Sequence, residues 1–162
     1  MSALERALAT RLVTLCRARR LTVTTAESCT GGLVGGAITA IPGASAVLDR
    51  GFVTYSNAAK TELLGVPAEL FGAVGAVSEA VARAMAAGAR LRANADLAVS
   101  VTGIAGPDGG SVDKPVGTVW FGLATVKGEL LAQHQLFTGD RDQIRAASVI
   151  YALEFLLDGI NQ

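Results

Sequence analysis

The sequence contains little cysteine and little histidine, and this limits the chemistry available to it. Only two cysteines, Cys16 and Cys29, occur among 162 residues, which is too few for a disulfide framework. The single histidine, His134, lies in no recognisable motif. Metal sites need several His, Cys or carboxylate ligands at suitable spacing, and the sequence shows no such set. We therefore expect a reducing, cytoplasmic environment and an activity that uses no metal and no other cofactor.

Long apolar runs and net charge are lacking as well. No apolar run free of Gly or polar breaks reaches the roughly 20 residues of a membrane span. The first eight residues are amphipathic with mixed charge, unlike a signal peptide. Fourteen basic residues balance fourteen acidic ones, whereas nucleic-acid-binding proteins usually have a basic excess. The sequence thus predicts no membrane or nucleic-acid partner. It leaves the oligomeric state open, with a homo-oligomer as one alternative.

The order of apolar segments and turn residues predicts alternating helices and strands. We expect helices over residues 2–19, 31–40, 57–64, 78–93 and 140–157, with a short helical piece from Pro67, and strands over 22–26, 47–55, 96–101, 117–126 and 129–137. The last two strands form a hairpin. We therefore expect one domain over residues 1–162 with an α/β fold, a three-layer α/β/α sandwich with a mixed, mostly parallel sheet.

Residues 26–32, with the sequence AESCTGG, carry the strongest chemical signal. They connect a β-branched strand to an apolar helix and place a hydroxyl and a thiol at the turn. Backbone N–H groups at such a turn bind anions and stabilise an oxyanion that develops in a transition state. Ser28 is therefore a candidate nucleophile for acyl transfer, and Cys29 is the alternative nucleophile. The simpler interpretation is that Ser28 or Thr30 only caps the helix.

A serine nucleophile needs a base, and His134 is poorly placed for that role. Residues 52–57 end a predicted strand, and Lys60 follows one helical turn after Asn57; it is one of three lysines against eleven arginines. A lysine in an apolar or cationic site has a lowered pKa and can accept a proton from serine, as in Ser-Lys enzymes. Lys60 is thus the candidate base, and Tyr55 is a candidate to hold it or relay a proton. The alternatives are a surface lysine and a tyrosine that only packs.

Two further segments are suited to an anionic ligand. A glycine-rich loop at residues 102–115 follows a buried strand, and α/β sheets bind ligands at such strand ends. Arg141 and Arg145 lie four residues apart at a helix start and so share a face. Arginine binds phosphate in a bidentate manner, which predicts a small phosphorylated ligand. The alternatives are a merely mobile loop and local ion pairs with Asp140 and Asp142.

Together these segments resemble the CinA C-terminal domain family, which includes the stand-alone nicotinamide-nucleotide amidohydrolases. The matching motifs are residues 26–32, 51–57 with Lys60, 75–78, 101–110 continuing to 114–119, and 139–141 with Arg145. They occur in order over nearly the whole chain, so the resemblance is more specific than any single glycine motif.

The resemblance implies a three-layer fold and hydrolysis of the carboxamide of nicotinamide mononucleotide to nicotinate mononucleotide and ammonia, without a metal. It implies that Ser28 is the nucleophile, that Lys60 and Tyr55 activate it, and that Thr102 supplies an active-site hydroxyl. The oxyanion, ribose and phosphate of the substrate are expected at Thr30, Gly31, Gly32, Gly103, Gly106, Arg141 and Arg145. Two other classes remain open: a non-catalytic nucleotide-binding module, and a partner-binding protein associated with competence or DNA damage.

Overall fold

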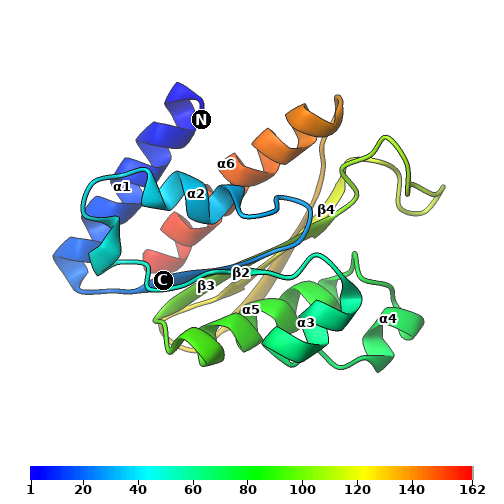
Figure 1. Cartoon of the computed structure of the whole chain (residues 1–162), viewed down its shortest axis with the longest axis horizontal. Coiled ribbons are helices and arrows are strands. Elements are labelled where there is room, and N and C mark those ends of the chain that lie inside the picture. The colour runs from blue at the N-terminus through cyan, green and yellow to red at the C-terminus, as the bar shows by residue number, and fades with distance from the viewer. Residues whose placement is uncertain (162) are drawn as a thin grey trace.

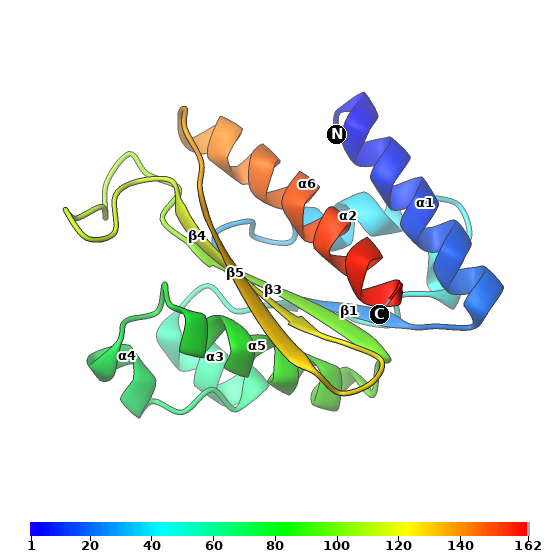
Figure 2. The same cartoon turned by 180° about the vertical axis from the view of Figure 1, so that it is seen from behind.

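A five-stranded sheet with helices on both faces forms the molecule in the computed structural model, which describes residues 1–161 (Figures 1 and 2). In chain order the elements are α1 (Ala3–Arg19), β1 (Val23–Glu27), α2 (Leu33–Thr39), the 3-10 helix η1 (Ala44–Ala46), β2 (Phe52–Val53), α3 (Asn57–Leu64), α4 (Glu69–Ala73), α5 (Glu79–Ala93), β3 (Leu97–Gly103), β4 (Thr118–Ala124), β5 (Leu130–Leu136) and α6 (Arg141–Ile160). Helices α1, α2 and α6 lie on one face, and α3, α4 and α5 lie on the other (Figure 2). Within residues 1–161, no helix combines the length and the apolar character that a membrane crossing requires.

The sheet has the strand order β2-β1-β3-β4-β5. Strand β1 pairs in parallel with β2 and with β3, whereas the β3–β4 and β4–β5 pairs are antiparallel. The predicted α/β class and mixed sheet are confirmed, but two of the four pairings are antiparallel, so the sheet is not mostly parallel. The reason is that no helix connects β3 to β4. A loop and then a hairpin reverse the chain there, and such connections give antiparallel neighbours.

Two apolar clusters join the helices to the sheet. One contains Leu12 of α1, Ile38 of α2 and Leu153 of α6, and the other contains Leu64 of α3 and Met85 of α5. The second cluster determines where α3 lies. A Cβ atom at Gly88 of α5 would lie 1.9 Å from the backbone oxygen of Leu64, so glycine is needed for α3 to approach α5 this closely.

Local sequence signals account for most helix starts. The side chains of Ser56 and Ser78 accept hydrogen bonds from the first turns of α3 and α5. Asp140 and Gln143 form the predicted capping box at the start of α6. Because a cap stabilises the first turn of a helix by about 1 kcal/mol, these residues define where each helix begins. Helix α3 begins and ends at the predicted residues.

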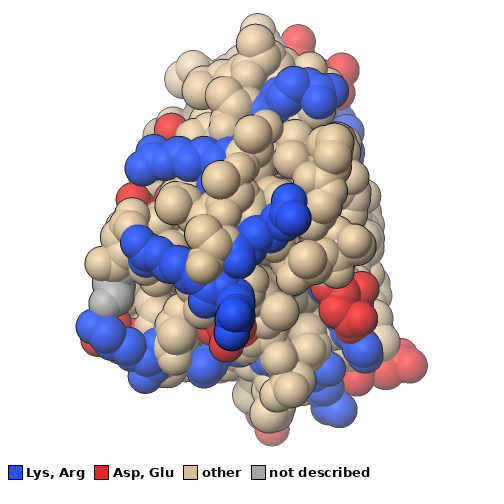
Figure 3. All heavy atoms as spheres, turned by 90° about the vertical axis from the view of Figure 1, so that its left-hand side faces the viewer, with Lys and Arg blue, Asp and Glu red and all other residues tan. Residues whose placement is uncertain are grey.

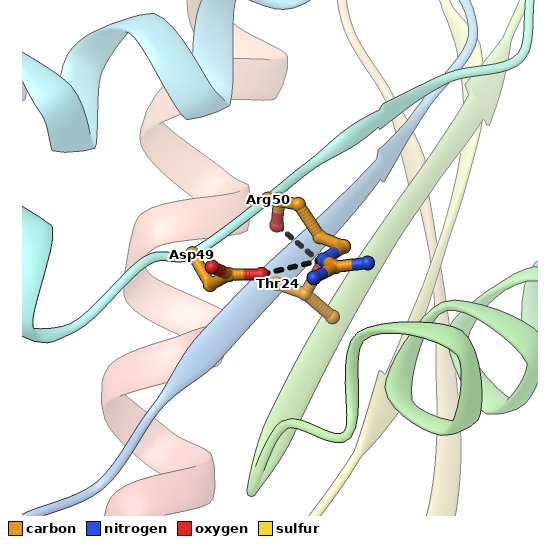
Figure 4. Close-up of polar contacts among 3 residues, drawn as sticks. All are labelled: Thr24, Asp49 and Arg50. Carbon is orange, nitrogen blue, oxygen red and sulfur yellow. Dashed lines mark hydrogen bonds and ion pairs between the residues drawn. The ribbon is translucent and has the colours of Figure 1, made fainter.

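The largest difference from the predicted elements concerns residues 47–55, of which only Phe52 and Val53 pair with β1. Figure 4 shows the reason. The hydroxyl of Thr24 in β1 donates to the backbone oxygen of Arg50 at 2.8 Å, and the Arg50 side chain pairs with that of Asp49. A side chain therefore binds the backbone oxygen of Arg50, and the ladder with β1 covers only Phe52 and Val53.

Basic side chains spread across the end of the molecule at which α1 finishes, and acidic side chains lie mostly toward the edges of this face (Figure 3). The last turn of α1 contains Arg17 and Arg19. Arg19 donates from Nη1 to the backbone oxygen of Ile160 at 2.7 Å, so it binds the C-terminal end of α6. Cations are favourable at the C-terminal ends of helices, and this accounts for basic residues at this end without a ligand.

Candidate active site

The structure brings Ser28 and Lys60 into direct contact. Ser28 begins the turn of residues 28–32 that follows β1, here called the nucleophile turn, and its N–H donates to the backbone oxygen of Val101 in β3 at 2.9 Å. Lys60 lies in the first turn of α3, whose start is fixed by Ser56. The Nζ atom of Lys60 is 3.1 Å from Oγ of Ser28. Nucleophile and base, predicted from separate segments, therefore lie within hydrogen-bonding distance.

Lys60 is buried, with 1% of its surface exposed. Its Nζ lies 2.9 Å from the backbone oxygen of Thr54 and 3.4 Å from that of Tyr55. Among residues 1–161 no carboxylate forms an ion pair with it. Burial lowers the pKa of Lys60 below its ordinary value of 10.5, against a smaller opposite effect of Cys29, because an unpaired charge is unfavourable away from water.

The three partners of Lys60 can serve either protonation state of its amine. A charged lysine has three N–H donors, and the carbonyls of Thr54 and Tyr55 and the hydroxyl of Ser28 can accept all three. A neutral lysine has two donors and one lone pair, and the hydroxyl of Ser28 can then donate to that lone pair. The lowered pKa of Lys60 favours the neutral form relative to an exposed lysine.

Cys29 lies beside Ser28 but in a different environment. It is 6% exposed and belongs to the apolar cluster beneath α2 and α6. Burial raises the pKa of its thiol to about 11, so the thiol is protonated at neutral pH. Because the thiolate is the reactive form of cysteine, these facts favour Ser28 over Cys29 as the nucleophile.

A cavity of about 260 Å³ opens next to Ser28. It lies between the nucleophile turn, the end of β2, the glycine-rich loop and the start of α6. Its lining contains Ser28, Cys29, Tyr55, Gly103, Ile104, Ala105, Gly106, Asp108, Gly109 and Arg141. The size suits a small molecule. Within residues 1–161 no group of three His, Cys, Asp or Glu side chains is arranged to hold a metal ion.

Arg141 and Tyr55 meet at this cavity. Arg141 donates from Nη1 to the backbone oxygen of Gly106 at 2.7 Å and from Nη2 to the hydroxyl of Tyr55 at 3.0 Å. The sequence predicts a contact between the Tyr55 hydroxyl and Lys60, whereas in the structure the backbone oxygen of Tyr55 lies 3.4 Å from Nζ of Lys60. The hydroxyl of Tyr55 instead contacts the cation that lines the ligand cavity.

Residues 5–160 of the chain match the family model of the CinA C-terminal domain. The chain belongs to the CinA C-terminal domain family. Members of known structure agree with it closely. The competence/damage inducible protein CihA from Agrobacterium tumefaciens is 48% identical, has a TM-score of 0.97, and is covered over 98% of its length by 100% of this chain.

Curated relatives of this chain are named as enzymes. The nicotinamide-nucleotide amidohydrolase PncC of Escherichia coli K12 is 57% identical over 140 residues, which are 86% of this chain and 85% of that protein. The protein of the same name from Pseudomonas putida is 54% identical over 93% of both chains. A CinA-like protein from Geobacter metallireducens is 53% identical over 91% of this chain but only 35% of its own length.

Three residues of the nucleophile turn that were expected to bind substrate do not line the cavity beside Ser28: Thr30, Gly31 and Gly32. The N–H of Gly31 donates to the backbone oxygen of Ser28 at 3.0 Å, and that of Gly32 donates to a carboxylate oxygen of Glu27 at 3.1 Å. Neither amide is free to bind an oxyanion in this structure. Thr30 is fully buried, and its hydroxyl has no partner within residues 1–161.

The side chains of Thr102 and Arg145 also bind backbone oxygens and do not line the cavity. The hydroxyl of Thr102 donates to the backbone oxygen of Ala76 at 2.9 Å, and the residue is 1% exposed. Arg145 donates to the backbone oxygens of Cys29 and Thr30. Neither side chain is part of the cavity lining beside Ser28. Both hold the segments that carry the site.

Glu27 is a site residue to which the sequence analysis gives no role. Its side chain is 1% exposed and accepts hydrogen bonds from the amides of Gly32, Val34 and Gly35 at 3.1, 3.0 and 2.9 Å. A carboxylate is favourable at a helix N-terminus because the unpaired N–H groups and the helix dipole attract it. An acidic residue at a strand end just before a helix is the sequence signal that could have indicated this role.

Asp108 is a second residue that the sequence analysis leaves without a role. It lies in the glycine-rich loop, is exposed, and lines the cavity beside Ser28. Its carboxylate can accept hydrogen bonds from hydroxyl groups of a ligand. The cavity lining therefore combines the hydroxyl of Ser28, the carboxylate of Asp108 and the guanidinium of Arg141.

Proposed function

We propose that this chain hydrolyses the carboxamide of nicotinamide mononucleotide to nicotinate mononucleotide and ammonia. The observation that carries the proposal is the 3.1 Å contact between Ser28 and a buried Lys60 at the edge of a small cavity. The 57% identity to a relative named nicotinamide-nucleotide amidohydrolase supports the substrate class. The cytoplasm is part of the proposal, and it is supported by two free cysteines.

In the first half of the reaction, neutral Lys60 takes the proton of Ser28 as Oγ attacks the amide carbon. The new C–O bond moves the electron pair of the carbonyl onto its oxygen, which becomes an oxyanion. Collapse of this intermediate restores the carbonyl and breaks the C–N bond. Lys60 returns the proton to the leaving nitrogen, and ammonia departs.

In the second half of the reaction, a water molecule takes the place of the ammonia that has departed. Lys60 removes a proton from a water molecule, whose oxygen attacks the acyl carbon of the ester on Ser28. Collapse breaks the C–O bond to Oγ, and the proton passes from Lys60 to Ser28. The product is released as a carboxylic acid that loses its remaining proton to water and becomes the nicotinate carboxylate, and the enzyme returns to its starting state.

The cavity lining assigns parts of the ligand to particular residues. Arg141 supplies the cation for the phosphate, because a guanidinium binds phosphate oxygens through paired N–H donors. Asp108 accepts hydrogen bonds from the ribose hydroxyls. Gly103 and Gly106 line the cavity. A Cβ atom at Gly106 would lie 2.5 Å from Cγ1 of Val116, so glycine is needed there for the loop to pack against Val116.

The proposal is tested by incubating the purified chain with nicotinamide mononucleotide. Ammonia is measured with a coupled glutamate dehydrogenase assay and the nucleotide product by chromatography. We expect equal amounts of ammonia and nicotinate mononucleotide. Binding of the nucleotide without ammonia release would contradict the proposed hydrolysis and would support a non-catalytic nucleotide-binding module.

Replacing Arg141 by alanine is expected to raise KM for nicotinamide mononucleotide by about 10- to 100-fold, since hydrogen bonds to charged groups contribute about 1.5–3 kcal/mol. The kcat value is expected to change little, because the phosphate is bound equally in ground and transition states. Nicotinamide riboside lacks the phosphate and should lose little activity in the same variant. Equal losses with both substrates would show that Arg141 acts only by holding Tyr55 and Gly106.

A further inference from the structure

Helix α2, which follows the nucleophile turn, has no cap of its own. Its N-cap residue is Gly32, which has no side chain to accept a hydrogen bond, whereas α3, α5 and α6 each begin at a residue whose side chain does so. The helix is seven residues long and contains Gly35 and Gly36, and glycine is a poor helix former. Since so short a helix is marginal in isolation, α2 depends on an acceptor from another segment.

Glu27 supplies that acceptor from the end of β1. Its carboxylate is 1% exposed and accepts the N–H groups of Gly32, Val34 and Gly35 at 3.1, 3.0 and 2.9 Å. No basic side chain forms an ion pair with it among residues 1–161. Backbone amides, and not a cation, therefore stabilise this buried charge. Because hydrogen bonds to a charged acceptor are stronger than neutral ones, the carboxylate fixes the start of α2 relative to β1.

The backbone of Glu27 fixes the other end of the nucleophile turn. The peptide group between Glu27 and Ser28 accepts a hydrogen bond from the N–H of Thr54 at 2.8 Å and donates one to the backbone oxygen of Val101 at 2.9 Å. Strand β1 lies between β2 and β3, so this peptide group is held from both neighbouring segments. One residue thus holds the turn at both ends, with its backbone next to Ser28 and with its side chain at Gly32.

Thr54 extends this arrangement to the base. Its N–H donates to the backbone oxygen of Glu27, and its own backbone oxygen lies 2.9 Å from Nζ of Lys60. Nζ is in turn 3.1 Å from Oγ of Ser28. Covalent bonds and hydrogen bonds therefore form a closed ring through Glu27, Thr54, Lys60 and Ser28. A displacement of Glu27 changes the distance between the nucleophile and its base.

We infer that Glu27 is a positioning residue, which binds the start of α2 and thereby keeps Oγ of Ser28 within reach of Nζ of Lys60. Proton transfer to a general base requires hydrogen-bonding distance, and a displacement of about 1 Å can lower a rate by about 100-fold. Glu27 does not line the cavity beside Ser28, so it acts through Ser28 and not on the ligand. The inference rests on the proposed function, in which Ser28 is the nucleophile and Lys60 is the base.

Glu27→Met removes both acceptor oxygens at a similar side-chain volume. We expect kcat for nicotinamide mononucleotide to fall by about 10- to 100-fold. KM should change little, because Glu27 does not line the ligand cavity. Glu27→Gln keeps one acceptor oxygen, so its kcat should lie between those of the parent chain and Glu27→Met. A raised KM at unchanged kcat would contradict the positioning role.

Glu5→Met is the matched control. Glu5 is also a buried carboxylate at a helix start, 8% exposed, and it accepts the N–H of Ser2 in the capping box of α1. It does not line the cavity beside Ser28. Its loss should lower the melting temperature and leave kcat unchanged. If Glu27 has only a structural role, Glu27→Met should behave in the same way at temperatures at which both variants are folded.

A second measurement does not depend on the nicotinamide nucleotide. A fluorophosphonate reacts with an activated serine: Oγ forms a bond to phosphorus, the P–F bond breaks, fluoride leaves and the serine proton passes to the base. The labelling rate therefore reports on the pair of Ser28 and Lys60. We expect labelling at least about tenfold slower in Glu27→Met, intermediate in Glu27→Gln and unchanged in Glu5→Met. Melting temperatures and circular dichroism identify any variant that fails to fold.

The outcomes separate this inference from the proposed function. A parent chain that releases no ammonia, but is labelled more slowly in Glu27→Met, would contradict the proposed substrate and support the positioning role. An active parent chain, with unchanged kcat and labelling rate in folded Glu27→Met, would overturn the positioning role alone. A parent chain that is neither active nor labelled would overturn both. If Glu27→Met does not fold, the same comparison with Glu27→Gln decides, since the positioning role predicts a reduced kcat and labelling rate at unchanged KM.

Discussion

Ser28→Ala is expected to abolish ammonia release, with kcat at least about 10³-fold below that of the parent chain. The substitution removes only the Oγ atom that Lys60 contacts at 3.1 Å, and without it no acyl-enzyme ester can form. Since Ser28 is half-buried and its Oγ has Lys60 as its only side-chain hydrogen-bond partner within residues 1–161, the fold should be retained. Calorimetry should show that the variant still binds nicotinamide mononucleotide.

Cys29→Ala is the matched control for this experiment. The Cys29 thiol is buried, and its pKa is raised to about 11, so its loss should remove packing rather than reactivity. We expect ammonia release within a few-fold of the parent and a small decrease in the melting temperature. Near-normal turnover in Ser28→Ala combined with complete loss in Cys29→Ala would identify the thiol as the nucleophile instead.

The parts of the fold that depend on local sequence could be predicted. Helices α3, α5 and α6 begin next to Ser56, Ser78 and Asp140, and each cap contacts a backbone N–H three residues further on. The sequence predicts a strand over residues 47–55, but its short length could not be predicted, because the backbone oxygen of Arg50 is bound by the side chain of Thr24, 26 residues away. The apolar pattern within residues 47–55 does not indicate such a contact.

The candidate site, like the fold, could be predicted only in part. Ser28 and Lys60 could be proposed from residue type and position, since a serine nucleophile without a suitable histidine needs another base. The sequence could not indicate which side of the nucleophile turn faces the ligand. Arg141 and Arg145 share a helical face, yet about 6 Å of axial rise separates them. One therefore reaches Tyr55 at the cavity, whereas the other reaches the carbonyls behind Ser28.

Lys60→Met is expected to lower kcat by about 10²- to 10⁴-fold, the range attributed to a general base. Methionine fills nearly the same volume but cannot accept a proton. Lys127→Met, at an exposed position in the β4–β5 turn, is the matched control and should retain activity. Melting temperatures show whether loss of the contacts to the carbonyls of Thr54 and Tyr55 affects folding.

The pH dependence of the parent chain follows from the lowered pKa of Lys60. At low pH the amine is protonated and cannot accept the proton of Ser28, so kcat/KM should rise with pH along a limb whose midpoint lies below 10.5, the ordinary lysine value. Lys60→Arg keeps a positive charge that does not titrate in this range. It should be nearly as inactive as Lys60→Met and should lack the limb. Substantial activity in a folded Lys60→Arg chain would mean that position 60 supplies only positive charge, and another group would have to remove the proton of Ser28.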